Sequence, residues 1–181
     1  MFKENFHIEF SKYIKYTFTL NYFHVYEPSY GIPGNYGENE IRIWNFKRGD
    51  QYAINYYINE LNKNRLFDQN TFYIAPPSSQ PGIEKFCHAM NSKNFSGRTF
   101  EPFFLKNDQY PTSKSRNVLQ KYNGLNVNQN IPRNTITICL VDDVYTSGST
   151  LKACLMHLID LGHTSVKVLT MARTEGSNPL F

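Results

Sequence analysis

The sequence predicts an α/β fold in which helices flank a parallel sheet. Three times along the chain a strand pattern is followed by a helix pattern, as in proteins that are built on a parallel sheet. The 181 residues suit one domain, and neither an internal repeat nor a low-complexity linker divides them. We therefore expect a single domain over 1–181, with an α/β core at 41–175 and an N-terminal extension at 1–40.

The first half of the chain contains two predicted strands, a loop and a helix. Residues 16–27 alternate and are rich in aromatic and β-branched side chains, which is typical of a strand. Three glycines and two prolines predict a loop at 28–39, and residues 41–47 alternate again as a second strand. A helix follows with Asp50 as its N-cap, and its apolar positions are Ile54, Tyr57, Ile58 and Leu61.

The middle of the chain combines regular elements with an irregular segment. A short buried strand is expected at 71–75, and Pro76–Ser79 connects it to a second helix. Residues 91–111 show no sustained period and are interrupted by glycine and proline, which predicts a mobile segment. Residues 113–122 favour a short helix. The apolar positions of the second helix are Ile83, Phe86, Cys87 and Met90.

The C-terminal part has the clearest strand–helix–strand pattern. Residues 135–141 form a nearly continuous apolar run, which is typical of a strand buried on both faces of a parallel sheet. The helix after it stops at Gly162, and a last strand is predicted at 166–171. The apolar stripe of this helix consists of Leu151, Cys154, Leu155, Leu158 and Ile159.

Composition and charge exclude several classes of protein. No apolar run approaches the roughly 20 residues that span a bilayer, and the first residues do not resemble a secretory signal. Three cysteines without a CxxC spacing favour buried thiols in a reducing cytoplasm over a zinc site. The net charge of +4 comes from scattered basic residues, which support only nonspecific attraction to nucleic acid. We expect a cytoplasmic protein without a membrane partner.

The segment 138–150, ICLVDDVYTSGST, combines the features of a ligand site. A buried strand ends in Asp142 and Asp143, and a turn of small residues opens directly into a helix, where free amides bind anions. Such a turn lies beyond the carboxyl end of a strand, where α/β sheets bind ligands. Gly148 lets successive amides converge on a phosphate. The acids would repel that phosphate, so we expect them to face sugar hydroxyls. Further donors are the hydroxyls of Thr146, Ser147, Ser149 and Thr150.

Two other interpretations of this segment are open. The first is an ordinary N-capped helix beside a solvated pair of acids, which would need no ligand. The second is the Walker B strand of a nucleotidase, which also ends in two acids. That strand requires a companion GxxxxGK[ST] motif, and the chain has none.

The thirteen residues of this segment resemble the phosphoribosyl pyrophosphate (PRPP) motif of type I phosphoribosyltransferases. The chain is most similar to the ComF-type group associated with competence, in which a helix resembling TLKACLMHLIDLGH and a strand resembling VKVLTMAR follow the motif. The resemblance is strong over 136–173. Before it, FKRGDQYAINYYINEL and SKSRNVLQKYNGLNV are similar to two further segments of that group. The resemblance implies a type I phosphoribosyltransferase-like sheet beneath an N-terminal hood.

The resemblance also assigns roles to the residues of the motif. It implies that Asp142 and Asp143 hold the ribose 2′- and 3′-hydroxyls, and that 146–150 wrap the 5-phosphate. Val144 and Tyr145 complete the PRPP-binding segment. The ring of Tyr145 either covers the ribose or packs in the core.

For the leaving group, the resemblance points to a loop after the second strand of the core. This pyrophosphate loop falls on Pro77, Ser78 and Ser79, although an ordinary Pro-Pro turn explains the same residues. Lys114 and Arg116 would close over the pyrophosphate, and Lys47 and Arg48 could reach it from a strand end. Mg²⁺ would bridge pyrophosphate and ribose oxygens, without a direct protein ligand.

The implied reaction transfers 5-phosphoribosyl from PRPP to a nitrogen acceptor and releases pyrophosphate. Two departures from the ComF pattern leave an alternative open. The sequence lacks the usual Cys-rich metal module, and SQPGIEKFCHAM replaces an expected Arg-rich stretch. A PRPP- or nucleotide-sensing regulatory protein, associated with competence or DNA, would fit these departures. The acceptor is not identified, because the family selects it with a variable hood, and a homodimer is compatible with the family.

Overall fold

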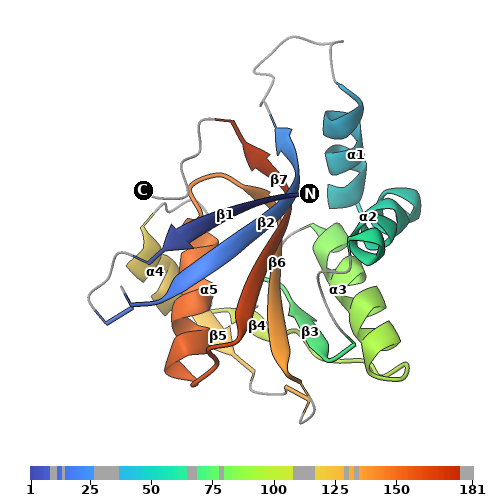
Figure 1. Cartoon of the computed structure of the whole chain (residues 1–181). Coiled ribbons are helices and arrows are strands. Elements are labelled where there is room, and N and C mark those ends of the chain that lie inside the picture. Colours follow the sequence, from blue (N-terminus) through green and yellow to red (C-terminus); the bar gives the residue numbers. More distant parts are fainter. Residues whose placement is uncertain are drawn as a thin grey trace.

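The computed structural model describes residues 1–8, 12–13, 15–26, 37–64, 69–77, 80–107, 117–128, 131–132 and 135–175. Its main sheet has five strands in the order β1-β2-β7-β6-β3, and only the pair of β1 and β2 is antiparallel. The predicted α/β class with a mostly parallel sheet is therefore confirmed (Figure 1). The strands are β1 (Phe2–His7), β2 (Thr17–Tyr26), β3 (Thr71–Ile74), β6 (Thr137–Tyr145) and β7 (Val166–Thr174).

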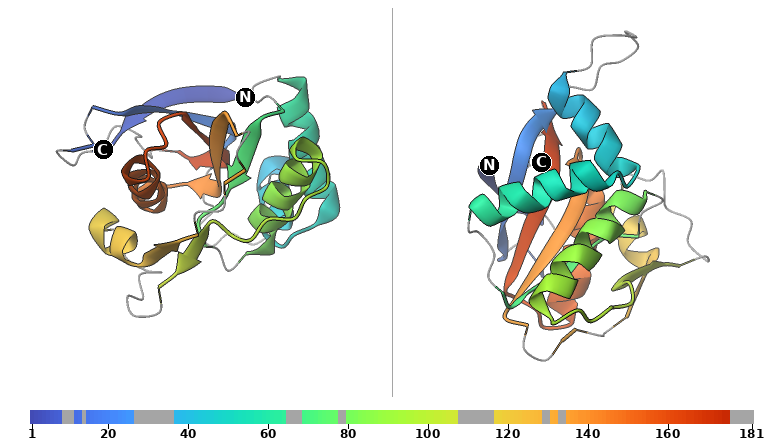
Figure 2. Two further views of the ribbon diagram at one scale, coloured as in Figure 1. Left: turned by 90° about the horizontal axis from the view of Figure 1, so that it is seen from below. Right: turned by 90° about the vertical axis from the view of Figure 1, so that its right-hand side faces the viewer.

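Helices cover both faces of this sheet (Figures 1 and 2). One face carries α1 (Glu38–Lys47), α2 (Gln51–Lys63) and α3 (Pro81–Asn94). The other carries α5 (Ser149–Asp160), on which α4 (Val118–Asn123) packs. A small second sheet pairs β4 (Phe104–Lys106) with β5 (Leu125–Val127). No helix in the described part of the chain is long and apolar enough to cross a membrane.

Several local predictions are confirmed. The Asp50 carboxylate accepts a hydrogen bond from the Ala53 amide at 2.9 Å, which caps α2. Gly162 has a φ of +84° directly after α5, as its role as a helix stop requires. The short helix expected at 113–122 begins only at Val118, and residues 113–116 lie outside the described part.

Residues 41–47 form most of α1, and the prediction of a strand there was wrong. Ile43 and Phe46, three positions apart, are buried together, whereas Ile41 and Trp44 are about half exposed. This three-residue spacing places one helical face against the core. Over only seven residues the same apolar positions also read as an alternating strand, so the periodicity could not decide between the two.

The described N-terminal strands belong to the main sheet rather than to a separate hood. β2 pairs with β7 in parallel register, and β1 adds the antiparallel edge. Glu4 of β1 accepts hydrogen bonds from Tyr22 at 2.5 Å and from Arg173 of β7 at 2.7 and 2.8 Å, which ties the three strands together. Residues 27–36 of the predicted loop lie outside the described part.

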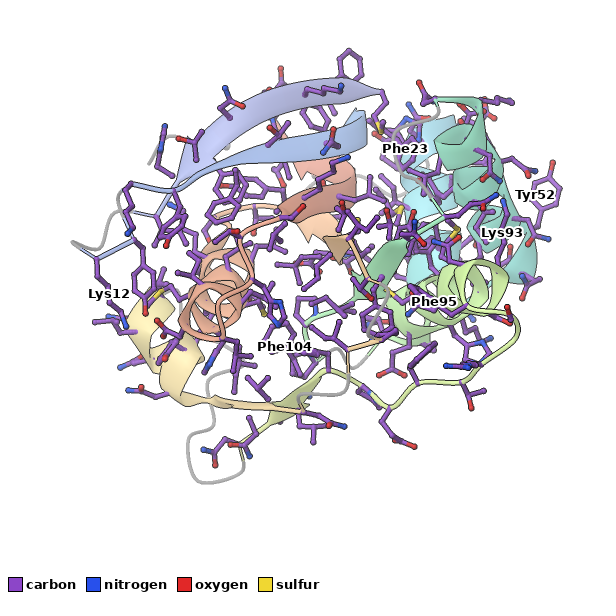
Figure 3. The ribbon with its side chains drawn as sticks, turned by 60° about the horizontal axis from the view of Figure 1, so that its bottom comes forward. Lys12, Phe23, Tyr52, Lys93, Phe95 and Phe104 are labelled. Carbon is purple, nitrogen blue, oxygen red and sulfur yellow. The ribbon has the colours of Figure 1, made fainter. Side chains whose placement is uncertain are left out.

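The segment predicted to be mobile begins as a well-packed part of the core. Its first residues, 91–94, are the last turn of α3, and Phe95, Phe103 and Phe104 are buried. Figure 3 shows Phe95 and Phe104 in the interior, while Tyr52 points outward from α2. The aromatic positions follow no helical or strand period, so the pattern did not reveal their burial. Residues 108–116, which include Lys114 and Arg116, lie outside the described part.

Asn91 protects the open edge of β3. Its side chain accepts from the Tyr73 amide and donates to the Tyr73 carbonyl, both at 2.8 Å, and it is 5% exposed. These two bonds replace those that a further strand would make, which keeps the edge from pairing with another chain.

We expect Asn91→Ala to destabilise the protein by about 2–4 kcal/mol, because two buried backbone groups lose their partner. The midpoint of urea unfolding measures this loss. Ser92→Ala on the same turn, which is half-buried, serves as the control and should change stability by less than about 0.5 kcal/mol. Equal midpoints for the two variants would show that the Asn91 bonds contribute nothing.

Candidate functional site

The carboxyl end of β6 extends beyond its neighbour β3. The pairing of the two strands ends where Leu140 lies opposite Ile74, but β6 remains paired with β7 up to Tyr145 and Arg173. The strand is therefore longer than the predicted 135–141 and includes both acids. Its last residues lie at the carboxyl edge of the sheet, where α/β proteins bind ligands.

Because both acids belong to the strand, they point to opposite faces of the sheet. Asp142 lies on the same face as Leu140, two residues before it, and this face packs against α5. The charge of Asp142 accordingly acts on the thiol of Cys154 in that helix. Asp143 faces α1, where Lys47 Nζ lies 3.4 Å from its Oδ2. The two carboxylates therefore do not lie side by side on one face of the sheet.

The two acids also differ in their electrostatics. Burial, followed by the charge of Asp143, raises the pKa of Asp142 to about 7. A hydrogen bond from the Asp143 amide at 2.9 Å and the positive charges of Lys47 and Lys121 oppose this rise in the pKa. Asp142 therefore keeps its proton to a higher pH than an ordinary carboxyl group does.

Sequence reasoning missed Lys121, which reaches this site because α4 packs on α5. The ring of Tyr122 stacks on His157 with centroids 3.9 Å apart, and its hydroxyl donates to Asp160 at 2.7 Å. These contacts fix α4 beside α5 and bring the charge of Lys121 near Asp142. No local pattern in the sequence carries this information, because the contact joins residues that are distant along the chain.

The turn after β6 is built around Gly148. Its φ is +67°, a left-handed conformation that glycine adopts without steric cost. A Cβ at this position would lie 2.6 Å from the ring of Tyr145. That ring is 1% exposed and lies 6.1 Å from the ring of Phe6, so the structure places Tyr145 in the core and not over the site.

The polar groups of the turn are arranged around the start of α5. Thr146 and Ser147 are exposed, Thr150 is half-buried and Ser149 is buried. The Ser147 hydroxyl donates to the Ser149 hydroxyl at 3.2 Å and accepts from the Ser149 amide at 3.4 Å. The first amides of a helix lack intrahelical acceptors, and the helix dipole favours negative charge there. The turn can therefore hold a phosphate.

The described start of the predicted pyrophosphate loop lies at the same edge of the sheet. β3 is parallel to β6 and ends at Ile74, so Pro76 and Pro77 follow it at the carboxyl edge. Ser78 and Ser79 lie outside the described part of the chain. Lys114 and Arg116 lie outside it as well. Among the residues of the predicted loop and these two cations, Pro77 is therefore the one that the structure describes.

A cavity of about 540 Å³ lies along the open edge of β3. Both aromatic and charged residues line it, but none of the residues 142–150 does. Of the predicted site residues that the structure describes, only Pro77 lines it. The acids and the turn at 142–150 therefore lie apart from this cavity. We assign the candidate site to the acids and the turn, because they carry the polar groups that can bind a ligand.

The donors present fit Mg²⁺ only together with a substrate. Magnesium binds proteins through one or two carboxylates and completes its coordination with water and phosphate oxygens. Asp142 and Asp143 are the carboxylates at this edge, and they point apart. Within the described residues, no group of three or more His, Cys, Asp or Glu side chains could hold a metal ion. The cysteines Cys87, Cys139 and Cys154 are all free and buried.

Comparison with known proteins adds no further assignment. The chain matches no protein-family model, and no curated protein matches it.

Proposed function

We propose that the protein is a phosphoribosyltransferase that uses PRPP and Mg²⁺, transfers 5-phosphoribosyl to a nitrogen acceptor and releases pyrophosphate. The observation that carries the proposal is the end of β6. Two acids, a left-handed turn at Gly148 and the start of α5 follow one another at the carboxyl edge of a parallel sheet. This order of groups suits a sugar phosphate, with hydroxyls at the acids and the 5-phosphate at the turn.

In this proposal the protein acts by position and charge. A nitrogen lone pair of the acceptor forms a bond to ribose C1, while the bond from C1 to the pyrophosphate oxygen breaks and its electrons leave with pyrophosphate. Positive charge develops on the sugar, and the carboxylates of Asp142 and Asp143 stabilise it. Mg²⁺, when bound with PRPP, neutralises phosphate charge. The proposal places the reaction in the cytoplasm and allows a homodimer.

PRPP with Mg²⁺ is expected to stabilise the folded protein. Ligand at a hundredfold excess over its dissociation constant adds about 2.7 kcal/mol, which corresponds to a rise of roughly 5–10 °C in Tm for a chain of this size. A thermal-shift titration measures the rise, with PRPP plus a chelator as its control. The absence of any shift at millimolar PRPP and Mg²⁺ would contradict the proposal.

A sensing role is the second candidate, because the Arg-rich stretch expected after the second strand is replaced by the start of α3. A sensor, with DNA as one conceivable partner, would bind PRPP without consuming it. Pyrophosphate release in the presence of a panel of nucleobases and amines distinguishes the two roles. Turnover with any acceptor establishes the transferase.

A further inference from the structure

An ion pair joins the end of α1 to the end of β6. Lys47 Nζ lies 3.4 Å from Asp143 Oδ2, and the two side chains are 34% and 18% exposed. Lys47 is the last residue of α1, where the helix dipole favours a positive charge. A lysine thus occupies the carboxyl edge of the sheet beside an acid that the proposed function assigns to the ribose.

A close approach of two helices fixes the place of Lys47. Gly82 lies in the first turn of α3, and a Cβ there would overlap the carbonyl oxygen of Phe46 and come within 3.4 Å of Lys47 Cα. α3 starts a few residues after β3, and Pro77 is described between them. Lys47 therefore lies between the end of β6 and the connection that follows β3.

Three further cations that the structure describes near this edge have interactions of their own. The Arg48 guanidinium lies over the exposed ring of Trp44, 4.4 Å from its centroid. The structure therefore places it on the outer side of α1 and not beside Lys47 at Asp143, where it was expected to reach the pyrophosphate. Lys85 Nζ donates to the carbonyl of Gly49 at 2.9 Å. Lys121 acts on Asp142, on the opposite face. Lys47 and Lys121 thus both act on acids that a bound ribose would engage, and of the two Lys47 is the one described in direct contact with its acid, at 3.4 Å.

We propose that Lys47 binds the pyrophosphate group of PRPP, and that it exchanges Asp143 for this group when PRPP binds. The inference rests on the proposed function. In the free protein Lys47 neutralises Asp143. Once the ribose hydroxyls donate to Asp143, the ammonium group turns to the pyrophosphate. As the bond between C1 and oxygen breaks, the ammonium stabilises the negative charge that develops on the departing oxygen, without transferring a proton.

The test compares two ligands that differ only in pyrophosphate, PRPP and ribose 5-phosphate, each with Mg²⁺. Lys47→Gln should weaken PRPP binding by about 10- to 100-fold, the effect of one charge-assisted hydrogen bond. Ribose 5-phosphate should bind at least as well as to the unmodified protein, because Lys47 no longer competes for Asp143. Lys47→Arg should restore most of the PRPP affinity. Arg48→Gln removes an equal charge one residue away and should leave both affinities within about threefold.

The outcomes separate the inference from the proposed function. If the unmodified protein binds neither ligand, the proposed function fails and the inference fails with it. If the unmodified protein binds PRPP but Lys47→Gln weakens both ligands equally, or neither of them, only the role of Lys47 is overturned. If Arg48→Gln matches Lys47→Gln, the effect is that of net charge, and the specific role is also overturned.

Discussion

Asp142→Asn is expected to make the folded protein more stable at pH 8, by about 2–4 kcal/mol, while it removes catalysis. The folded-state pKa of Asp142 is raised from 3.8 to about 7 by burial and by Asp143. The folded state therefore holds a proton that the unfolded chain releases, so stability falls as the pH rises from about 4 to about 7. Above pH 7 the protein carries the full cost of a half-buried carboxylate, and asparagine removes it.

Urea unfolding of both proteins at pH 4 and pH 8 measures this effect. The gain from Asp142→Asn should be present at pH 8 and nearly vanish at pH 4, where the native Asp142 is protonated. Asp143→Asn is the matched control. It breaks the partly exposed pair with Lys47, which contributes only about 0–1 kcal/mol, and it also relieves the repulsion that Asp143 exerts on Asp142. It should therefore stabilise the protein at pH 8 by less than Asp142→Asn does. A loss of stability in Asp142→Asn at pH 8 would refute this account of the site.

In the same two variants we expect turnover to fall much more than the affinity for PRPP. Each asparagine keeps the size of the side chain but removes a charge that matters most when the sugar becomes cationic. We expect PRPP to bind within about tenfold of the unmodified protein, while turnover falls by more than about a hundredfold. Normal turnover in either variant would show that its carboxylate has no part in the reaction.

Gly148→Ala is expected to destabilise the protein by about 2–4 kcal/mol and to abolish PRPP binding. The new Cβ would lie 2.6 Å from the buried ring of Tyr145, and the residue would also have to keep a φ of +67°. The left-handed conformation costs about 1–2 kcal/mol and the steric overlap about 1–3 kcal/mol. Gly148 is buried against the core, so a substitution here affects the fold as well as the site.

Gly162→Ala is a control that separates the backbone cost of Gly148→Ala from its steric cost. Gly162 has a similar φ of +84°, but no atom lies within 4 Å of the position that its Cβ would take. This control should therefore lose only about 1 kcal/mol and bind PRPP normally. Unfolding and PRPP titrations on both variants measure the difference. Equal losses of stability would mean that Tyr145 does not restrict residue 148.

The sequence by itself determined the elements that depend on neighbouring residues. The apolar spacing of α2, α3 and α5, the Asp50 cap and the Gly162 stop are local, because helices form contacts within a few residues. The order of strand, turn and helix over 138–150 is local as well. The same reasoning failed over 41–47, where seven residues are too few to distinguish a helical period from an alternating one.

Only the tertiary structure decided how the distant parts of the site meet. The pairing of β6 with β7 extends β6 past Asp142 and Asp143, and the side chains of adjacent strand residues then point apart. The packing of α1 against β6 pairs Lys47 with Asp143, and the packing of α4 on α5 brings the charge of Lys121 to Asp142. Such contacts join residues far apart in the chain, so their free energy depends on the assembled sheet and helices and leaves no periodic trace in the sequence.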